Sequence, residues 1–87
     1  MILITVHDKV AGTWSAPTVV ENKACAVRDF RTATSKPGSI LAEHPDDYEL
    51  WIIGEWIVPY DLKKVPSLSV FDNFEFVECG VPHDGKD

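Results

Sequence analysis

LAEHPDDYELWIIGEW, residues 41–56, is the stretch that decides which fold this chain can adopt. Its first half contains a polar corner made of His44, Pro45, Asp46, Asp47 and Tyr48. Pro45 has no amide hydrogen and disfavours helical angles at the residue before it, while the two aspartates can accept hydrogen bonds from nearby amides and close a turn. The second half is rich in β-branched and aromatic residues until Gly54 interrupts it. The stretch therefore predicts a tight turn that leads into the central strand of a small sheet, with a bulge or a close backbone approach at Gly54.

The length of the chain limits it to one small domain. A chain of 87 residues buries only about 60–65% of its unfolded surface, so we expect marginal stability. Three Trp, two Tyr and four Phe can supply much of the core, and any that remain outside it could form a self-association interface. No apolar run is long enough to span a membrane, and the first residues lack the pattern of a signal peptide. Cys25 and Cys79 show no metal-binding or redox spacing, so we expect two reduced thiols in a cytosolic protein.

Charge is distributed unevenly along the chain, although the total is −6. Residues 1–40 hold five cations and three acids, which gives +2, whereas residues 41–87 hold three cations and eleven acids, which gives −8. The second half would repel a polyphosphate, so any nucleic acid must bind to the first half. The composition argues against a strong non-specific DNA-binding protein.

The first half of the chain predicts two strands and the main helix. Residues 1–6 have the pattern of a buried strand, and residues 14–20 that of an irregular or edge strand, because Pro17 cannot donate to a sheet ladder. Asn22 is a favourable N-cap for a helix over residues 23–34, which a Pro-Gly pair would end. One face of this helix gathers the residues that we expect to be buried: Ala26, Val27, Phe30 and Ala33.

The second half predicts two further strands. Residues 49–58 form the strongest candidate, and residues 68–77 alternate partially and could pair with it, with an irregularity near Asp72. The predicted fold is α+β, a small and mostly antiparallel sheet of about four strands in the order β-β-α-β-β, with one helix packed on one face. We expect a single domain over residues 1–79 and a flexible tail over residues 80–87.

The chain contains no convincing catalytic or metal-binding pattern. His44, Asp46 and Asp47 are too close in sequence to hold a metal ion rigidly, and a carboxylate-rich turn is the commoner explanation. His7 and Asp8 could form an acid–base pair, but no Ser or Cys nucleophile has a matching partner. Phosphate-binding loops and zinc patterns are also missing from the sequence. We therefore expect a protein that is not an enzyme and needs neither a metal nor another cofactor.

Cations on the predicted helix are the best candidates for a binding site. Arg28 and Arg31 lie one turn apart, and the planar guanidinium fork suits phosphate. The candidate nucleic-acid-binding residues are Lys23, Arg28, Arg31, Lys36 and Trp14. An alternative is that Arg28 or Arg31 pairs with an acid of residues 43–49 and so fixes the helix to the turn. Trp51 or its neighbours are expected in the core, whereas Trp14 could belong to the core, to an interface or to a DNA site, where its ring would stack on a base.

Several segments, taken together, resemble a viral protein family. They are His7-Asp8-Lys9-x-Ala11-Gly12, Pro17, Ala26-Val27-Arg28-Asp29-Phe30, the run LAEHPDDYEL at 41–50, and Gly54-Glu55. Over residues 1–57 this set is similar to the small non-structural protein of gokushovirus-type microviruses, the Microviridae, which are tailless bacteriophages with circular single-stranded DNA. From Val58 onward the chain matches no pattern of that family and is more aromatic than the family leads us to expect.

The resemblance implies a DNA-binding protein that is made in the cytoplasm of the infected bacterial host and is absent from the virion. It also implies a role in the switch from double-stranded replication to the synthesis and packaging of the single-stranded viral genome. It supplies no catalytic residues. The matched positions would be Arg28 on the helix and His44, Asp46, Asp47 and Tyr48 in the corner.

Two functions from different classes follow. The first is a module that binds single-stranded DNA through Lys23, Arg28, Arg31 and Trp14. The second is an interaction protein without direct DNA contact, which binds the phage replication initiator, a host replication protein or a second copy of itself through its acidic half and exposed aromatics. The surroundings of the cations separate the two. A helix face free of carboxylates favours DNA binding, whereas cations neutralised by acids of residues 43–49 favour the interaction protein.

Overall fold

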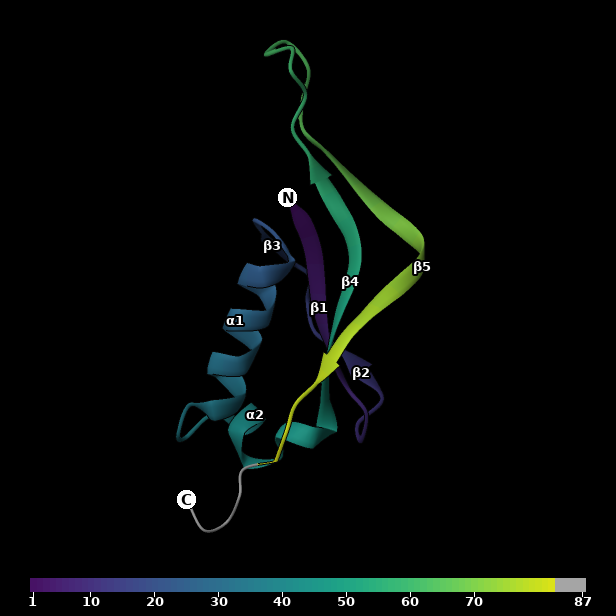
Figure 1. Cartoon of the computed structure of the whole chain (residues 1–87). Helices are drawn as coiled ribbons and strands as arrows, with labels where there is room; N and C mark the ends of the chain where they lie inside the picture. Colours follow the sequence, from purple (N-terminus) through teal and green to yellow (C-terminus); the bar gives the residue numbers. More distant parts are fainter. Residues whose placement is uncertain (83–87) are drawn as a thin grey trace.

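A curled antiparallel sheet with a helix on one face makes up the computed structural model, which describes residues 1–82 (Figure 1). The elements in chain order are β1 (Ile2–Asp8), β2 (Thr13–Trp14), β3 (Thr18–Val20), α1 (Lys23–Ser35), α2 (Ile40–Glu43), the 3₁₀ helix η1 (Pro45–Asp47), β4 (Tyr48–Ile57) and β5 (Ser67–Cys79). The strand order is β2-β1-β4-β5, with β3 also paired to β1, and every pairing is antiparallel. The predicted α+β class is confirmed.

The second predicted strand is divided into β2 and β3 because Pro17 lies between them. A proline cannot donate to a ladder, so pairing with β1 stops and resumes on either side of it. The turn before β2 uses Gly12, whose φ of 71° lies in the left-handed region that glycine adopts without strain. Its N–H donates to the carbonyl of Asp8 over 2.8 Å. Both short strands therefore sit on one edge of β1.

Helix α1 begins at the predicted N-cap, where the side chain of Asn22 accepts a hydrogen bond from the backbone N–H of Cys25. Its buried residues are Ala26, Phe30 and Thr34. Thr34 can be buried because its hydroxyl donates to the Phe30 carbonyl over 3.0 Å. Two members of the predicted stripe, Val27 and Ala33, are only half-buried. After α1, residues 40–43 form the short helix α2 where we expected a turn.

The central strand β4 is irregular beside Gly54, as predicted. The pairing of β4 with β1 and its pairing with β5 both shift register there. A Cβ atom at Gly54 would overlap the backbone carbonyl of Ser69, so only glycine permits this approach of β5. The same irregularity leaves residues 71–74 of β5 unpaired, which confirms the break expected near Asp72. Figure 1 shows the resulting bend in β5.

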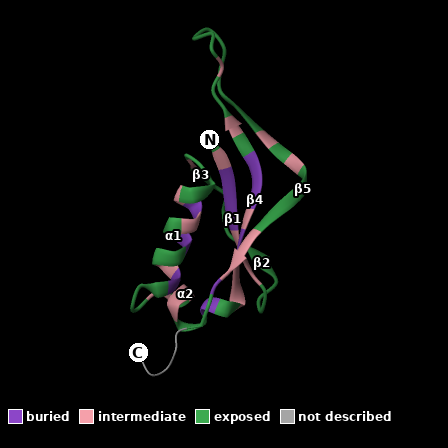
Figure 2. Ribbon diagram, in the orientation of Figure 1, coloured by how far each residue is buried: buried purple, intermediate pink, exposed green. Residues whose placement is uncertain are grey.

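The core lies between α1 and the sheet (Figure 2). Its buried cluster consists of Ile4, Ala26, Phe30, Leu50 and Ile52. Phe30 is the sole aromatic among the buried hydrophobic residues of the described chain, so the expectation that aromatics supply much of the core is wrong. The reason is strand alternation, which directs Leu50 and Ile52 toward α1 and Trp51 toward the opposite face.

The predicted corner is the 3₁₀ turn η1, and it joins the ends of three strands. Pro45 is buried, and the backbone N–H groups of Lys9 and Gly80 donate to the carbonyls of Asp47 and Tyr48, each over 2.9 Å. A Cβ atom at Gly80 would overlap the Pro45 carbonyl, so the end of β5 also needs glycine for its close approach. Ordered contacts thus extend one residue past the domain boundary that we predicted.

The hairpin formed by β4 and β5 projects beyond the rest of the sheet, which gives the molecule extents of 55 × 23 × 18 Å (Figure 1). Its connecting segment carries exposed apolar side chains, among them Tyr60 and Leu62. None of the helices in residues 1–82 is both long and apolar enough to cross a membrane. Residues 83–87, most of the predicted tail, lie outside the described part of the chain.

Candidate interaction surfaces

Two cations of α1 form ion pairs with acids of β5. The guanidinium of Arg31 donates from Nε to Oε2 of Glu78 over 3.1 Å and from Nη2 to Oε1 over 3.0 Å. The Nζ of Lys23 lies 3.0 Å from Oε2 of Glu75. The alternative that Arg31 pairs with an acid of residues 43–49 is wrong, because β5 and not the corner supplies these carboxylates.

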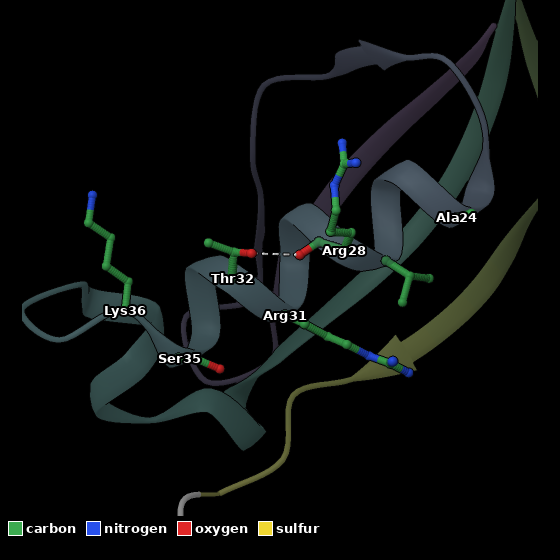
Figure 3. Close-up of a pocket in the computed structure, with 7 residues that line it drawn as sticks. Ala24, Arg28, Arg31, Thr32, Ser35 and Lys36 are labelled. Carbon is green, nitrogen blue, oxygen red and sulfur yellow. Dashed lines mark hydrogen bonds between the residues drawn. The ribbon is translucent and has the colours of Figure 1, made fainter.

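The remaining cations of the predicted DNA site are less engaged. The Nε of Arg28 lies 3.5 Å from Oδ1 of its neighbour Asp29, and Lys36 makes no side-chain hydrogen bond or ion pair within residues 1–82. An open groove along α1 is lined by Ala24, Val27, Arg28, Arg31, Thr32, Ser35 and Lys36. In Figure 3 the long side chains of Arg28, Arg31 and Lys36 point in different directions, with Arg31 reaching toward β5. The groove holds three cations, but they do not converge.

Trp14, the aromatic member of the predicted DNA site, lies on the face of the sheet opposite α1, which we call the outer face. Its ring stacks on His7 with a centroid distance of 4.2 Å and meets the rings of Trp51 and Phe74 edge-on at 5.6 and 5.9 Å. Trp51 in turn meets Phe76 edge-on at 5.4 Å. These five residues form one aromatic cluster across four strands, and the sheet separates it from the cations of α1.

The outer face is partly exposed: Leu3 and Thr5, which the register places on it, are buried, whereas the aromatic residues are not. Trp14, Phe74 and Phe76 are 45%, 43% and 48% exposed. Residues that lie opposite each other in an antiparallel pair share a face of the sheet. The register therefore places three exposed aliphatic residues on the outer face: Val19 opposite Leu3, Leu68 opposite Trp56 and Val70 opposite Gly54. The exposed apolar residues of the outer face are therefore Trp14, Val19, Leu68, Val70, Phe74 and Phe76. Exposed apolar residues gathered on one face are typical of surfaces that bind other molecules.

One carboxylate, that of Glu49, belongs to the aromatic cluster. Its Oε1 lies 3.1 Å from Nδ1 of His7 and accepts a hydrogen bond from Nε1 of Trp51 over 3.3 Å. The hydrogen bond with His7 lowers the pKa of Glu49, burial opposes this effect, and the bond from Trp51 adds to it. The possible acid–base pair of His7 with Asp8 does not form, because Asp8 instead accepts hydrogen bonds from the backbone amides of the following turn.

Neither the corner nor the two cysteines form a metal site in the described residues. No three His, Cys, Asp or Glu side chains in the described residues are placed to share a metal ion. Cys25 and Cys79 are free thiols. The Sγ of Cys79 lies 3.4 Å from the Nζ of Lys9 and 3.4 Å from the carbonyl oxygen of Asp46, at the junction of β5 with the corner.

The sequence predicted an interaction through exposed aromatics but did not show that they gather on the outer face. A signal was present, since Phe74 and Phe76 alternate with charged residues on a predicted strand. Such alternation does not reveal which face of a sheet a helix covers, and this chain places its aromatics on the uncovered one.

Comparison with known proteins identifies a protein family. A family model described as Phage ORF5 protein matches residues 1–58. The matched segment runs from β1 through the end of β4, so β5 and most of the segment that connects it to β4 lie beyond it. No curated protein and no solved structure matches the chain.

Proposed function

The chain belongs to the Phage ORF5 protein family, and from this premise we propose that it is a non-enzymatic phage protein that binds another protein with the outer face of its sheet. The observation that carries the proposal is the exposed part of the aromatic cluster, where Trp14, Phe74 and Phe76 are each nearly half exposed. Aromatic side chains are enriched at protein interfaces, and charged ones are depleted from the centres of those interfaces.

The state of the helix cations supports a protein partner over DNA. Lys23 and Arg31 pair with Glu75 and Glu78 of β5, so two of the cations are neutralised, but not by the predicted acids of residues 43–49. These contacts also turn both glutamates away from the outer face, because Glu75 pairs with Ile52 and Glu78 with Leu50 on the core side. Two of the acids that give the chain its net charge of −6 therefore lie away from the outer face.

A narrower assignment follows from the resemblance to the small non-structural protein of gokushovirus-type microviruses. We place the protein in the cytoplasm of the infected host and outside the virion. There it would act in the switch to single-stranded genome synthesis and packaging. The phage replication initiator and a host replication protein are partners of the right class for that step.

A phage that carries Phe74→Glu tests the proposal. Its control is Ile40→Glu, which introduces the same charge at an apolar residue that is 69% exposed on α2, away from the outer face. We expect Phe74→Glu to reduce the single-stranded progeny genomes per infected cell at least tenfold and Ile40→Glu to leave them unchanged. Normal progeny from Phe74→Glu, with the variant protein present at wild-type level, would contradict the proposal.

Direct binding of single-stranded DNA is the second candidate function. The specific observation in its favour is the open groove on α1, which brings Arg28, Arg31 and Lys36 to one surface. Its test is the binding of a labelled single-stranded oligonucleotide across a salt series, since a phosphate-binding protein loses affinity steeply as salt rises. Under this function, Arg28→Glu combined with Arg31→Glu abolishes binding. Unchanged affinity in the double variant would remove α1 from the site.

A further inference from the structure

We propose that the partner on the outer face is a second copy of this chain, so that two sheets pack face to face across Trp14, Phe74 and Phe76. This inference rests on the proposed function, because it names the occupant of the same surface. It would leave α1 of each copy on the outside of the dimer.

The first argument is the small size of the core. The described chain buries seven hydrophobic residues, whereas fifteen large hydrophobic residues are exposed. A core of this size gives limited stability, and oligomerisation is one of the ways in which small domains gain more. Both cysteines are free, and no metal-binding group is present in residues 1–82. Oligomerisation through the outer face would bury the aromatic cluster.

The second argument is the charge of the outer face. Its six exposed apolar residues carry no formal charge, and the carboxylate of Glu49 is held by His7 and Trp51. A nucleic acid would require cations on this face, and a basic protein would require free carboxylates. The apolar part of this face is the complement of another such surface. A second copy supplies one without bringing the acids of β5 together, because Glu75 and Glu78 lie on the core side.

The third argument is area. An aromatic side chain buries roughly 150–250 Å² when it is enclosed, so three aromatic and three aliphatic residues, each near half exposure, offer on the order of 500 Å² per copy. A standard interface buries about 800 Å² per partner, which includes a polar rim around such a centre. The patch is therefore large enough to form the centre of a two-fold symmetric interface, in which both copies use the same surface.

Sedimentation equilibrium of the full chain tests the inference. The wild-type mass should rise with concentration from 9.7 kDa toward twice that value. Phe74→Glu should weaken the dimer at least tenfold, and the control Ile40→Glu should behave as wild type. Because Phe74 contacts Trp14, a second variant, Val70→Lys, changes an outer-face residue that has no ring contact and is 57% exposed. Thermal unfolding followed by circular dichroism identifies variants that have lost the fold. A wild type that stays monomeric throughout, or a folded Val70→Lys that dimerises as wild type, would overturn the inference.

The phage experiment separates this inference from the proposed function. If the wild type is monomeric but Phe74→Glu still blocks progeny genomes, the outer face binds a different protein and the second copy is excluded. If Phe74→Glu breaks a dimer while progeny genomes stay normal, the second copy is supported and the proposed function is contradicted.

Discussion

Arg31 and Glu78 form a two-pronged ion pair that joins α1 to β5, with nitrogen–oxygen distances of 3.1 and 3.0 Å. The hydrogen bonds with Glu78 raise the pKa of Arg31. The pair removes a cation from the groove on α1 and a carboxylate from the surroundings of β5. One ion pair thereby weakens the case for DNA on the helix side and leaves the outer face apolar.

Release of these cations should raise the affinity for single-stranded DNA above that of the wild type. Glu75→Gln combined with Glu78→Gln frees Lys23 and Arg31, and each phosphate that a freed cation neutralises should steepen the logarithmic salt dependence of single-strand binding by about 0.7. Fluorescence anisotropy of a labelled oligonucleotide measures both the affinity and its salt dependence. The control is Glu55→Gln combined with Asp72→Asn, which changes the charge equally at carboxylates that pair with no cation among residues 1–82. An equal rise in affinity in the control would show that net charge alone is responsible.

Leucine truncation should separate the core from the outer face. Leu50 is 0% exposed, so Leu50→Ala should lower the free energy of unfolding by about 2–5 kcal/mol through lost burial and a new cavity. Leu68→Ala makes the same chemical change at a residue that is 52% exposed, and it should cost less than about 1 kcal/mol in the monomer at low protein concentration. Urea denaturation measures both values. Similar losses at the two positions would contradict the assigned core.

The glycine beside the bulge should not tolerate a side chain. Gly54→Ala directs a Cβ atom into the carbonyl of Ser69, and β5 must move away from β4 to accept it. We expect a loss of about 1–3 kcal/mol in the free energy of unfolding, as for other overpacked sites. Gly12→Asn is the control, because Gly12 has open space around it and asparagine tolerates its positive φ. A Gly54→Ala variant as stable as wild type would mean that the two strands are not this close.

The free energy of unfolding should decrease at low pH because Glu49 becomes protonated. Because hydrogen bonds lower its pKa in the folded state, Glu49 stabilises the fold above its unfolded value of about 4.5. That contribution is lost as the pH falls through the lowered folded value, so the urea midpoint should decline below about pH 4.5. Glu49→Gln should flatten this decline, whereas Glu55→Gln, at an exposed residue with no ion pair in the described chain, should preserve it. An equally steep decline in Glu49→Gln would contradict the assigned contact with His7.

Features that depend on local sequence could be predicted. The N-cap at Asn22, the break at Pro17 and the bulge at Gly54 each follow from the backbone chemistry of one residue. The corner was recognisable for the same reason, since Pro45 and the aspartates after it define a turn without help from distant residues.

Features that depend on tertiary structure could not be predicted from the sequence. The Arg31–Glu78 pair joins residues 47 positions apart, and it requires the register of β5 against β4. The position of Trp51 could not be predicted either. Strand alternation places Trp51 and Leu50 on opposite faces but does not say which face α1 will cover. The gathering of Trp14 with Phe74 depends on the strand order, which no local signal specifies.

Intermolecular nuclear Overhauser effects between isotope-labelled and unlabelled copies test most directly that the outer face is buried in the assembled protein. We predict contacts from the rings of Trp14, Phe74 and Phe76 to the methyl groups of Leu68 and Val70 in the other copy. Intermolecular contacts confined to α1, or none at concentrations where the wild type should be dimeric, would contradict it.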